Sequence, residues 1–197
     1  MPRVGLSRPQ LAERAAEIAD ATGWDRLTLA DVAASFGVRL PSLYKHVGSL
    51  AELRRDVSVV GARELLDALT AAVVGRSGAP AVRAMADAYR EFAERHPGRY
   101  AASVVAPAPG DEEHLAVAEQ LFGVLAAVLA EFGVDGNDAI HAIRALRALL
   151  HGFVALEAAG AYAMPLDLDE SYRRMVDGFT AGLTRSRPRI VPALPAR

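Results

Sequence analysis

Apolar residues recur three or four positions apart along almost the whole chain, and this helical spacing constrains the fold more than any other feature. Alanine and leucine dominate and β-branched runs are few, which favours helix over strand. The sequence therefore predicts an all-α fold. Glycine, proline and capping residues divide the pattern into about nine expected helices, over residues 8–22, 29–36, 40–47, 49–74, 80–95, 99–105, 111–132, 137–161 and 169–186.

Three of the expected helices begin with a capping-box pattern, in which a hydroxyl residue is followed three positions later by a residue that reaches back to it. The pairs are Ser7–Gln10, Thr28–Asp31 and Ser49–Glu52. The box at Thr28 is expected to be weaker, because aspartate is shorter than the usual glutamate. The expected domains are an N-terminal head, a helical body that begins with a long helix, and a proline-rich tail that we expect to be disordered, over residues 1–48, 49–187 and 188–197.

The composition fits a globular helical protein and excludes several other classes. Hydrophobic residues make up 52% of the 197 residues, so a buried core is expected and general disorder is excluded. There is no cysteine, which excludes disulfides and thiolate metal sites. The N-terminus has no signal-peptide stretch, and the longest uncharged apolar run, residues 121–130, is far shorter than the ~20 residues that span a bilayer. We expect a cytoplasmic protein without a membrane partner.

Nucleic-acid binding has to come from a local patch, because the net charge is −2. Two short helical segments meet at Gly37 within residues 28–48, with the small Ala33 at their expected contact, which is what a helix-turn-helix requires. Gly37 permits a positive φ at the turn. The exposed face of the second segment carries hydrogen-bond donors and an aromatic ring on a rod narrow enough for the major groove, namely Arg39, Ser42, Tyr44, Lys45 and His46.

This segment resembles the DNA-binding head of the tetracycline-repressor-like (TetR) family. The resemblance covers about residues 12–53 and rests on Thr28-Leu29-Ala30-Asp31-Val32-Ala33, Gly37-Val38, Leu43-Tyr44-Lys45-His46-Val47 and Leu53. The remaining chain fits the family's helical effector domain in outline. Two pieces of it, His96-Pro97 and His151-Gly152-Phe153, are similar to the branch with a WHG-type C-terminal domain.

The resemblance implies roles for individual residues of the head. In the family, the residues that match Thr28 and Tyr44 bind phosphates, and in many members so does the residue that matches His46. The residues that face base edges or the backbone match Arg39, Leu40, Pro41, Ser42 and Lys45. One departure concerns Leu50, which stands where many members have a phosphate-binding lysine. Arg54 or Arg55, one turn later, is a possible substitute.

Each of these residues also has a simpler interpretation. Tyr44 could be a buried aromatic of a small bundle, and Lys45 a solvated surface charge. The histidines of the body have no partner at metal-ligand spacing, and the pattern of catalytic triads, zinc motifs and phosphate loops is missing from the sequence. We therefore expect no metal, no cofactor and no enzymatic activity.

The body is expected to hold a ligand pocket and the dimer interface. Most of its aromatic residues are ordinary core, but a pocket among the helices over residues 49–74, 80–95, 111–132 and 137–161 would draw on some of them. The predicted ligand-binding residues are Met85, Tyr89, Phe92, Tyr100, His114, Phe122 and Phe153. The helix over residues 137–161 is apolar on more than one side, and the helix over residues 169–186 offers apolar residues with glycines that allow close approach. Pairing both helices with their twofold mates predicts a four-helix dimer interface. Its predicted residues are Leu146, Leu150, Met175, Phe179 and Leu183.

Together these features predict a homodimeric, ligand-responsive repressor. Two reading helices about 34–36 Å apart would sit over a palindromic operator, and a small-molecule effector would release it. Two alternatives remain open at this point. One is a helical small-molecule-binding protein that has lost operator binding, and the other is a helical enzyme.

Overall fold

The computed structural model describes residues 6–185, and within that range the regular structure is entirely helical, which confirms the predicted all-α fold. The predicted tail, residues 188–197, lies outside the described residues. The elements are α1 (Arg8–Thr22), the 3-10 turn η1 (Trp24–Arg26), α2 (Leu29–Ser35), α3 (Leu40–Leu43), α4 (Leu50–Val73), α5 (Gly78–Arg95), α6 (Pro97–Ser103), α7 (Glu112–Ala130), α8 (Gly136–Ala158) and α9 (Leu168–Arg185).

The largest departure from the expected boundaries lies at the second helix of the turn motif. The sequence predicts a helix over residues 40–47, whereas α3 ends at Leu43 and residues 44–46 form turns. The N–H of His46 donates to the carbonyl of Leu43 at 2.8 Å, an i→i−3 bond that tightens the chain. The N–H of Val47 donates to the same carbonyl at 3.1 Å, and Val47 is buried in the core at 1% exposure.

The head is a small bundle with its own core. Residues from α1, α2, α3 and the start of α4 pack together in one buried cluster, which includes Leu11, Leu27, Val32, Leu43, Val47, Leu53 and Val57. Gly37 adopts a φ of +65° at the turn, as its position predicts. Ala102 of α6 is fully buried in the same cluster, so the head core includes one residue from the body.

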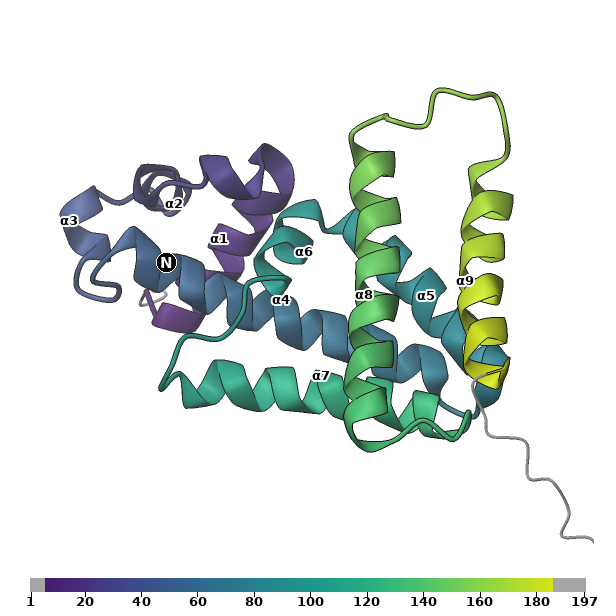
Figure 1. Ribbon diagram of the computed structural model, residues 1–197. Helices are drawn as coiled ribbons and strands as arrows, with labels where there is room; N and C mark the ends of the chain where they lie inside the picture. The colour runs from purple at the N-terminus through teal and green to yellow at the C-terminus, as the bar shows by residue number, and fades with distance from the viewer. Residues whose placement is uncertain (1–5, 186–197) are drawn as a thin grey trace, which may run out of the picture.

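Helix α4 connects the head with the body, and α6 packs against it. The 24 residues of α4 extend about 36 Å from the head into the body (Figure 1). Helix α6 packs on both α4 and α1 at backbone contact, because a glycine lies at each contact, Gly61 on α4 and Gly98 on α6 itself. A Cβ on Gly61 would lie 2.4 Å from the carbonyl oxygen of Arg99, and a Cβ on Gly98 would lie 2.2 Å from the carbonyl carbon of Ala19.

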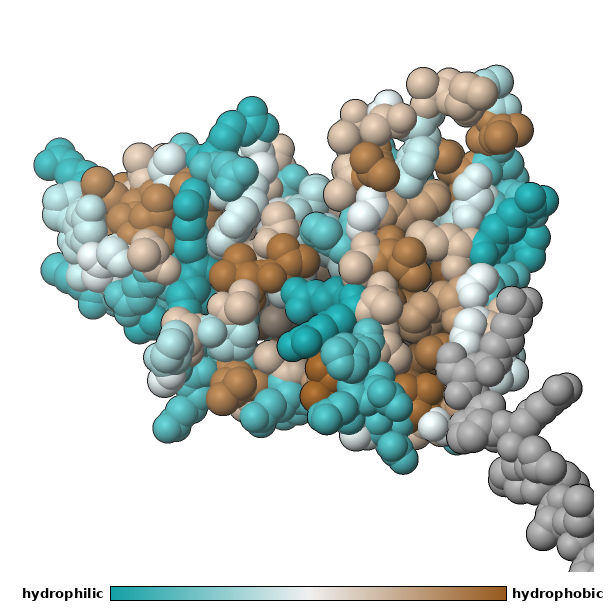
Figure 2. All heavy atoms as spheres, viewed as in Figure 1, coloured by the Kyte–Doolittle hydropathy of each residue, from teal (hydrophilic) through white to brown (hydrophobic). Residues whose placement is uncertain are grey.

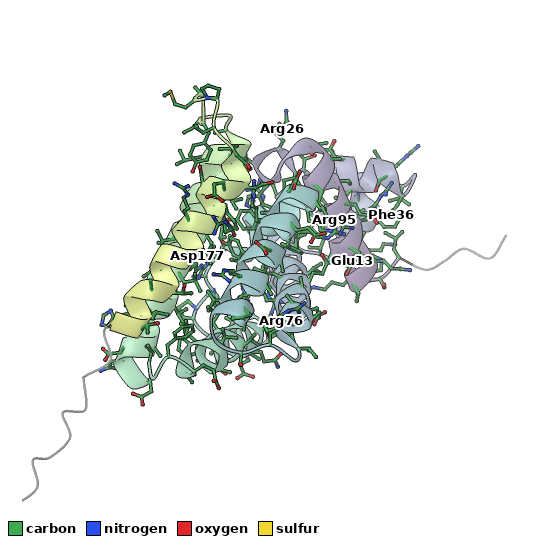
Figure 3. The ribbon with its side chains drawn as sticks, turned by 90° about the vertical axis from the view of Figure 1, so that its right-hand side faces the viewer. Glu13, Arg26, Phe36, Arg76, Arg95 and Asp177 are labelled. Atoms are coloured by element: carbon green, nitrogen blue, oxygen red, sulfur yellow. The ribbon has the colours of Figure 1, made fainter. Side chains whose placement is uncertain are left out.

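The body surrounds the far half of α4 with α5, α7, α8 and α9. Helices α8 and α9 stand side by side at the end of the molecule away from the head (Figure 1). Helix α9 is held to α5 by the phenol of Tyr172, which donates to the carbonyl of Ala86 at 2.6 Å. Asp177, which points from α9 toward α5, pairs with Arg83 at 2.6 Å (Figure 3).

Two helices, α7 and α8, are long and apolar enough to cross a bilayer, judged by length and composition alone. Only 22% of the apolar window of α7 and 39% of that of α8 is buried within the protomer. These helices therefore carry more apolar surface than the protomer core covers, and that surplus bears on both the ligand cavity and the dimer interface.

Candidate nucleic-acid interface and ligand cavity

The segment predicted to contact DNA, residues 28–46, begins at the capped N-terminus of α2. The hydroxyl of Thr28 accepts a hydrogen bond from the N–H of Asp31 at 3.2 Å and donates one to its carboxylate at 2.5 Å. The N–H of Val38 donates to the carbonyl of Ala33 at 3.1 Å and closes the glycine turn. The local sequence thus fixes the angle at which α3 leaves α2.

The side chains predicted to contact DNA lie on α3, the turns beside it and the start of α2, and none of them is buried. Tyr44 is 51% exposed, so it is not a core aromatic. Arg39 and Lys45 are also exposed, and within the described residues neither forms an ion pair. Leu40, Pro41, Ser42 and His46, on the same segment, are exposed or half-buried. Thr28, which precedes α2, is exposed. Figure 1 shows α3 at the far end of the molecule from α8 and α9.

Arg54 and Arg55, suggested as substitutes for a lysine at Leu50, both have protein partners in the structure. Arg54 lies 5.4 Å from the ring centroid of Trp24 and donates to the carbonyl of Asp25 at 3.0 Å. Arg55 faces the body, where it pairs with Asp111 and Glu113. Both guanidiniums are committed to protein partners, so neither is free for a phosphate.

A cavity of about 220 Å³ lies in the body, among α4, α5, α7, α8 and the segment that follows α6. Four of the predicted ligand-binding residues line it, namely Met85, Tyr89, His114 and Phe122. The deeper wall is aliphatic and buried, with Leu65, Leu69, Ile143 and Leu150 among its residues. Val105, Phe122 and Arg147 are exposed, so they mark where the cavity reaches the surface.

The other three predicted ligand-binding residues lie outside the cavity wall. Phe92 packs on His96, with ring centroids 5.4 Å apart. Phe153 lies in the core between Tyr162 and Tyr172, at 4.9 Å from each ring. Tyr100 stands behind Tyr89, and their hydroxyls are 3.0 Å apart. These rings fill space between helices, and their spacing in sequence does not distinguish that role from a ligand contact.

Sequence reasoning missed Arg147 and the segment from Ser103 to Pro107. Arg147 lines the cavity and donates to the carbonyl of Val104 at 3.2 Å. A signal was present, because Arg147 follows Ile143 by four positions and so shares its helix face. His151, one turn further on, is hydrogen bonded through its Nδ1 to the hydroxyl of Tyr100 at 2.5 Å.

Two titratable groups of the cavity wall are perturbed by burial. Burial raises the pKa of the Tyr89 phenol, which the hydrogen bond to Tyr100 and the charge of Arg147 partly oppose. Burial also lowers the pKa of His114, although the negative charge of Asp111 acts against it. His114 is therefore neutral at pH 7, and at 3% exposure its ring has no hydrogen-bond partner among the described residues.

A chain of ion pairs runs from the start of α7, beside His114, to the head. Asp111 caps α7 by accepting from the N–H of His114, and Arg55 donates to it at 2.7 Å. Arg55 also contacts the buried Asp56 at 3.1 Å, and Asp56 accepts two bonds from Arg8 at 2.6 and 2.9 Å. The hydrogen bond from Arg55 holds the pKa of the Asp111 carboxyl well below its usual range.

Two of the residues predicted for a dimer interface are unavailable to a partner. Leu146 and Leu150 are each 2% exposed and belong to the protomer core, which corrects that prediction. Met175, Phe179 and Leu183 are half-buried against the same core. The exposed apolar residues of α8 are Ala145, Ala148, Leu149, Ala155, Leu156 and Ala158. The sequence showed that α8 has surplus apolar surface, but it did not show which stripe faces inward.

Comparison with known proteins identifies the family of this chain. Residues 82–179 match the family model of the tetracyclin repressor-like C-terminal domain. That description is general, and the WHG-type branch stays a prediction. The chain is 39% identical to the HTH-type transcriptional regulator Rv0681 of Mycobacterium tuberculosis, covering 91% of this chain and 83% of that one. It is 36% identical to the HTH-type regulator YobS of Bacillus subtilis, covering 92% and 95%.

The same fold is found among solved structures. A TetR variant from Acinetobacter baumannii, solved in complex with minocycline, superposes with a TM-score of 0.69 at 21% identity, covering 93% of this chain and 99% of that one. At this identity the likeness shows the fold alone. Together with the two relatives and the family model, the helix-turn-helix head and helical body show that the chain belongs to the TetR family of HTH-type transcriptional regulators, and that it is not an enzyme.

Proposed function

We propose that the protein is a ligand-responsive repressor, which binds a palindromic operator as a homodimer in the cytoplasm and releases it when a small molecule enters the cavity. One observation carries the proposal: α6 touches both sites. Its first turn packs on α1 of the head at Gly98, and its last residue, Ser103, lines the cavity. A ligand that displaces residues of the cavity wall would therefore move α6 and, through its contact with α1, the head.

The exposed face around α3 supplies the DNA contacts. Arg39 precedes the first turn of α3 and is free of protein partners among the described residues, so it is the residue best placed to read a guanine, worth about 1–3 kcal/mol if bidentate. Tyr44, Lys45 and His46 lie beside it and suit phosphate oxygens. Since phosphate contacts release counterions, the affinity should fall steeply with salt. Leu40 is apolar and suits a thymine methyl group.

The exposed apolar residues of α8, together with α9, form the proposed dimer face. Figure 2 shows hydrophobic atoms gathered along α8 and the seam beside α9, while the outer edge of α9 is hydrophilic. Leu149 and Leu156 are 39% and 49% exposed on this face. A Cβ at Gly152 or Gly178 would meet no described atom within 4 Å, so both positions leave room for a partner helix. Pairing α8 and α9 with their twofold mates would bury the surplus apolar surface.

Two connections couple the cavity to the head. The first is α6, which Arg99 ties to α1 and α4, because its N–H donates to Asp20 at 2.8 Å and its guanidinium lies 2.9 Å from Glu64. The second is the ion-pair chain from Asp111 through Arg55 to the head. A ligand that separates α6 from α7 would move both connections. Conversion from mostly bound to mostly released takes about 5.5 kcal/mol of preference for the released state.

A second function is also supported by one observation. Leu50 has no charge, and the two arginines that follow it are engaged with protein groups, so the head has fewer phosphate contacts than many family members. A ligand-binding protein without operator activity would share this property. The same experiment separates the two functions.

The test is fluorescence anisotropy on the DNA upstream of the protein's own gene, titrated with the full chain at several salt concentrations. We expect selective binding, and at least a 100-fold loss when Tyr44 and Lys45 are both changed to alanine. Arg76→Ala is the control, because Arg76 is an exposed cation far from α3 (Figure 3). Selective duplex binding that survives the double change in a folded dimer would refute the proposed reading surface. Absence of selective binding by the unaltered protein would support the second function.

A further inference from the structure

The charges on the cavity wall limit what kind of molecule it accepts. Among its lining residues there is no aspartate or glutamate, and the only formal charge is the guanidinium of Arg147. His114 adds none at pH 7, because burial lowers its pKa. A cationic ligand would therefore meet a positive charge without a counterion. A polyanion would bring more negative charge than one arginine balances, and unpaired charge in an apolar wall is costly.

Arg147 has spare capacity to bind an anion. A guanidinium carries five N–H donors, and among the described residues this one makes a single side-chain hydrogen bond, to the carbonyl of Val104. Tyr89 lines the same cavity, and the positive charge of Arg147 partly opposes the rise that burial causes in the pKa of its phenol. The planar fork of donors matches a carboxylate, which it can bind through two parallel hydrogen bonds.

The remainder of the cavity is narrow and apolar. The lining residues of α7 run from His114 to Leu125, which corresponds to about 16 Å along the helix axis. Facing them are aliphatic side chains from the other helices, namely Leu65, Leu69, Met85, Ile143 and Leu150. A dry cavity of roughly 150 Å³ holds a benzene ring. The 220 Å³ here therefore fits one ring with a short chain, or a medium-length alkyl chain.

His114 provides an independent sign that the cavity has a ligand. It is 97% buried, lines the cavity, and has no side-chain hydrogen bond among the described residues. The buried side-chain atoms without a partner among the described residues belong to Arg54 and Arg99, so the ring nitrogens of His114 keep some access to the cavity, where a ligand can pair with them. A neutral imidazole has one donor and one acceptor, so it suits a carbonyl or hydroxyl group on an otherwise apolar molecule.

We propose that the cavity binds a small, largely apolar monocarboxylic acid, with its carboxylate on Arg147 and its apolar body along α7. This inference rests on the proposed ligand-binding role of the cavity and specifies the class of ligand. Sugars and nucleotides do not fit, since they bring many polar groups and the wall offers few partners. Simple hydrocarbons fill the space but form no ion pair with Arg147, whose exposed guanidinium stands where the cavity reaches the surface.

The experiment compares acids with their uncharged amides. Phenylacetic, 4-phenylbutyric and octanoic acids, each beside its primary amide, are titrated into the full-length protein by calorimetry at pH 7.5. We expect at least one acid to bind at least tenfold tighter than its amide. In Arg147→Met, which keeps an unbranched stem, the preference for that acid should vanish while amide binding is unchanged. Arg144→Met is the matched control, because Arg144 is exposed on α8 outside the cavity wall, and it should keep the preference.

Three results would overturn the inference: amides that bind as tightly as the acids, an acid preference that persists in Arg147→Met, or no binding by any of the three acids at millimolar concentration. A failure of the proposed function looks different. An acid that binds through Arg147 but leaves the operator complex intact refutes ligand-controlled release and supports the class of ligand. A ligand of another class that occupies the cavity and releases the operator refutes only the class.

Discussion

Gly98 is the position where one added methyl group tests the contact between head and body. A Cβ there would lie 2.2–2.4 Å from three backbone atoms of Ala19 and Asp20. Backbone atoms cannot rotate away as a side chain can. Since ordinary contacts begin near 3.4 Å, α1 and α6 would have to separate by about 1 Å in Gly98→Ala.

The magnitude follows from two opposing effects. Inserting a methyl group into a tightly packed contact typically costs about 1–3 kcal/mol. Replacing glycine by alanine in a helix returns about 0.5–1 kcal/mol. We therefore expect Gly98→Ala to lower the free energy of unfolding by about 1–2 kcal/mol. For a chain of this length, that corresponds to a fall in Tm of roughly 2–8 °C.

The assay is thermal unfolding at one fixed protein concentration, because dimer stability depends on concentration. Gly123→Ala is the matched control, since Gly123 lies in α7 and its added Cβ would meet no described atom within 4 Å. It should leave Tm unchanged or raise it. In the operator assay, Gly98→Ala should also weaken binding without any ligand, because it forces apart the helices that a ligand is proposed to separate. A Tm for Gly98→Ala equal to or above that of the unaltered protein would refute the close α1–α6 contact.

Three further substitutions test a phosphate contact of the head, the buried histidine of the cavity and the dimer face. In Leu50→Lys the lysine stem can lie along the same half-buried surface, so operator binding should tighten and the slope of log affinity against log salt concentration should steepen by about 1. An unchanged slope would mean that this position does not face a phosphate. Burial lowers the pKa of His114, so as the pH falls the imidazole of the unfolded chain takes up a proton, near its ordinary pKa of about 6.5, before that of the folded chain does. The free energy of unfolding should therefore fall as the pH drops from 7 to 5.5, and it should fall less in His114→Gln. Tm curves of the two proteins that run parallel over this pH range would contradict this. Leu149→Glu, at an exposed apolar position of α8, should give monomers by light scattering, while Val74→Glu, at a 71% exposed position, should remain dimeric; a dimeric Leu149→Glu would place the interface elsewhere.

The structure of the helix-turn-helix head was largely predictable, because the residues that determine it are close together in sequence. The cap at Thr28, the glycine turn and the apolar positions of α2 and α3 lie within some twenty residues, and each acts on the backbone beside it. The exposure of Tyr44 follows from these local features, because they set the path of the short segment that carries it. The end of α3 at Leu43 was not predicted, because Leu43 and Val47 are four positions apart and both are buried, a spacing that a continued helix satisfies equally well.

The sequence by itself determined the helices, their approximate limits and the helix-turn-helix, since periodicity and caps are properties of consecutive residues. Only the tertiary structure decided which side chains meet across them. Arg147 and Tyr89, 58 positions apart, share a cavity because of how α8 and α5 are rotated about their axes. Leu146 and Leu150 are core rather than interface for the same reason. Helix rotation depends on the packing of all neighbours at once, and a helix as apolar as α8 carries no single stripe that specifies it.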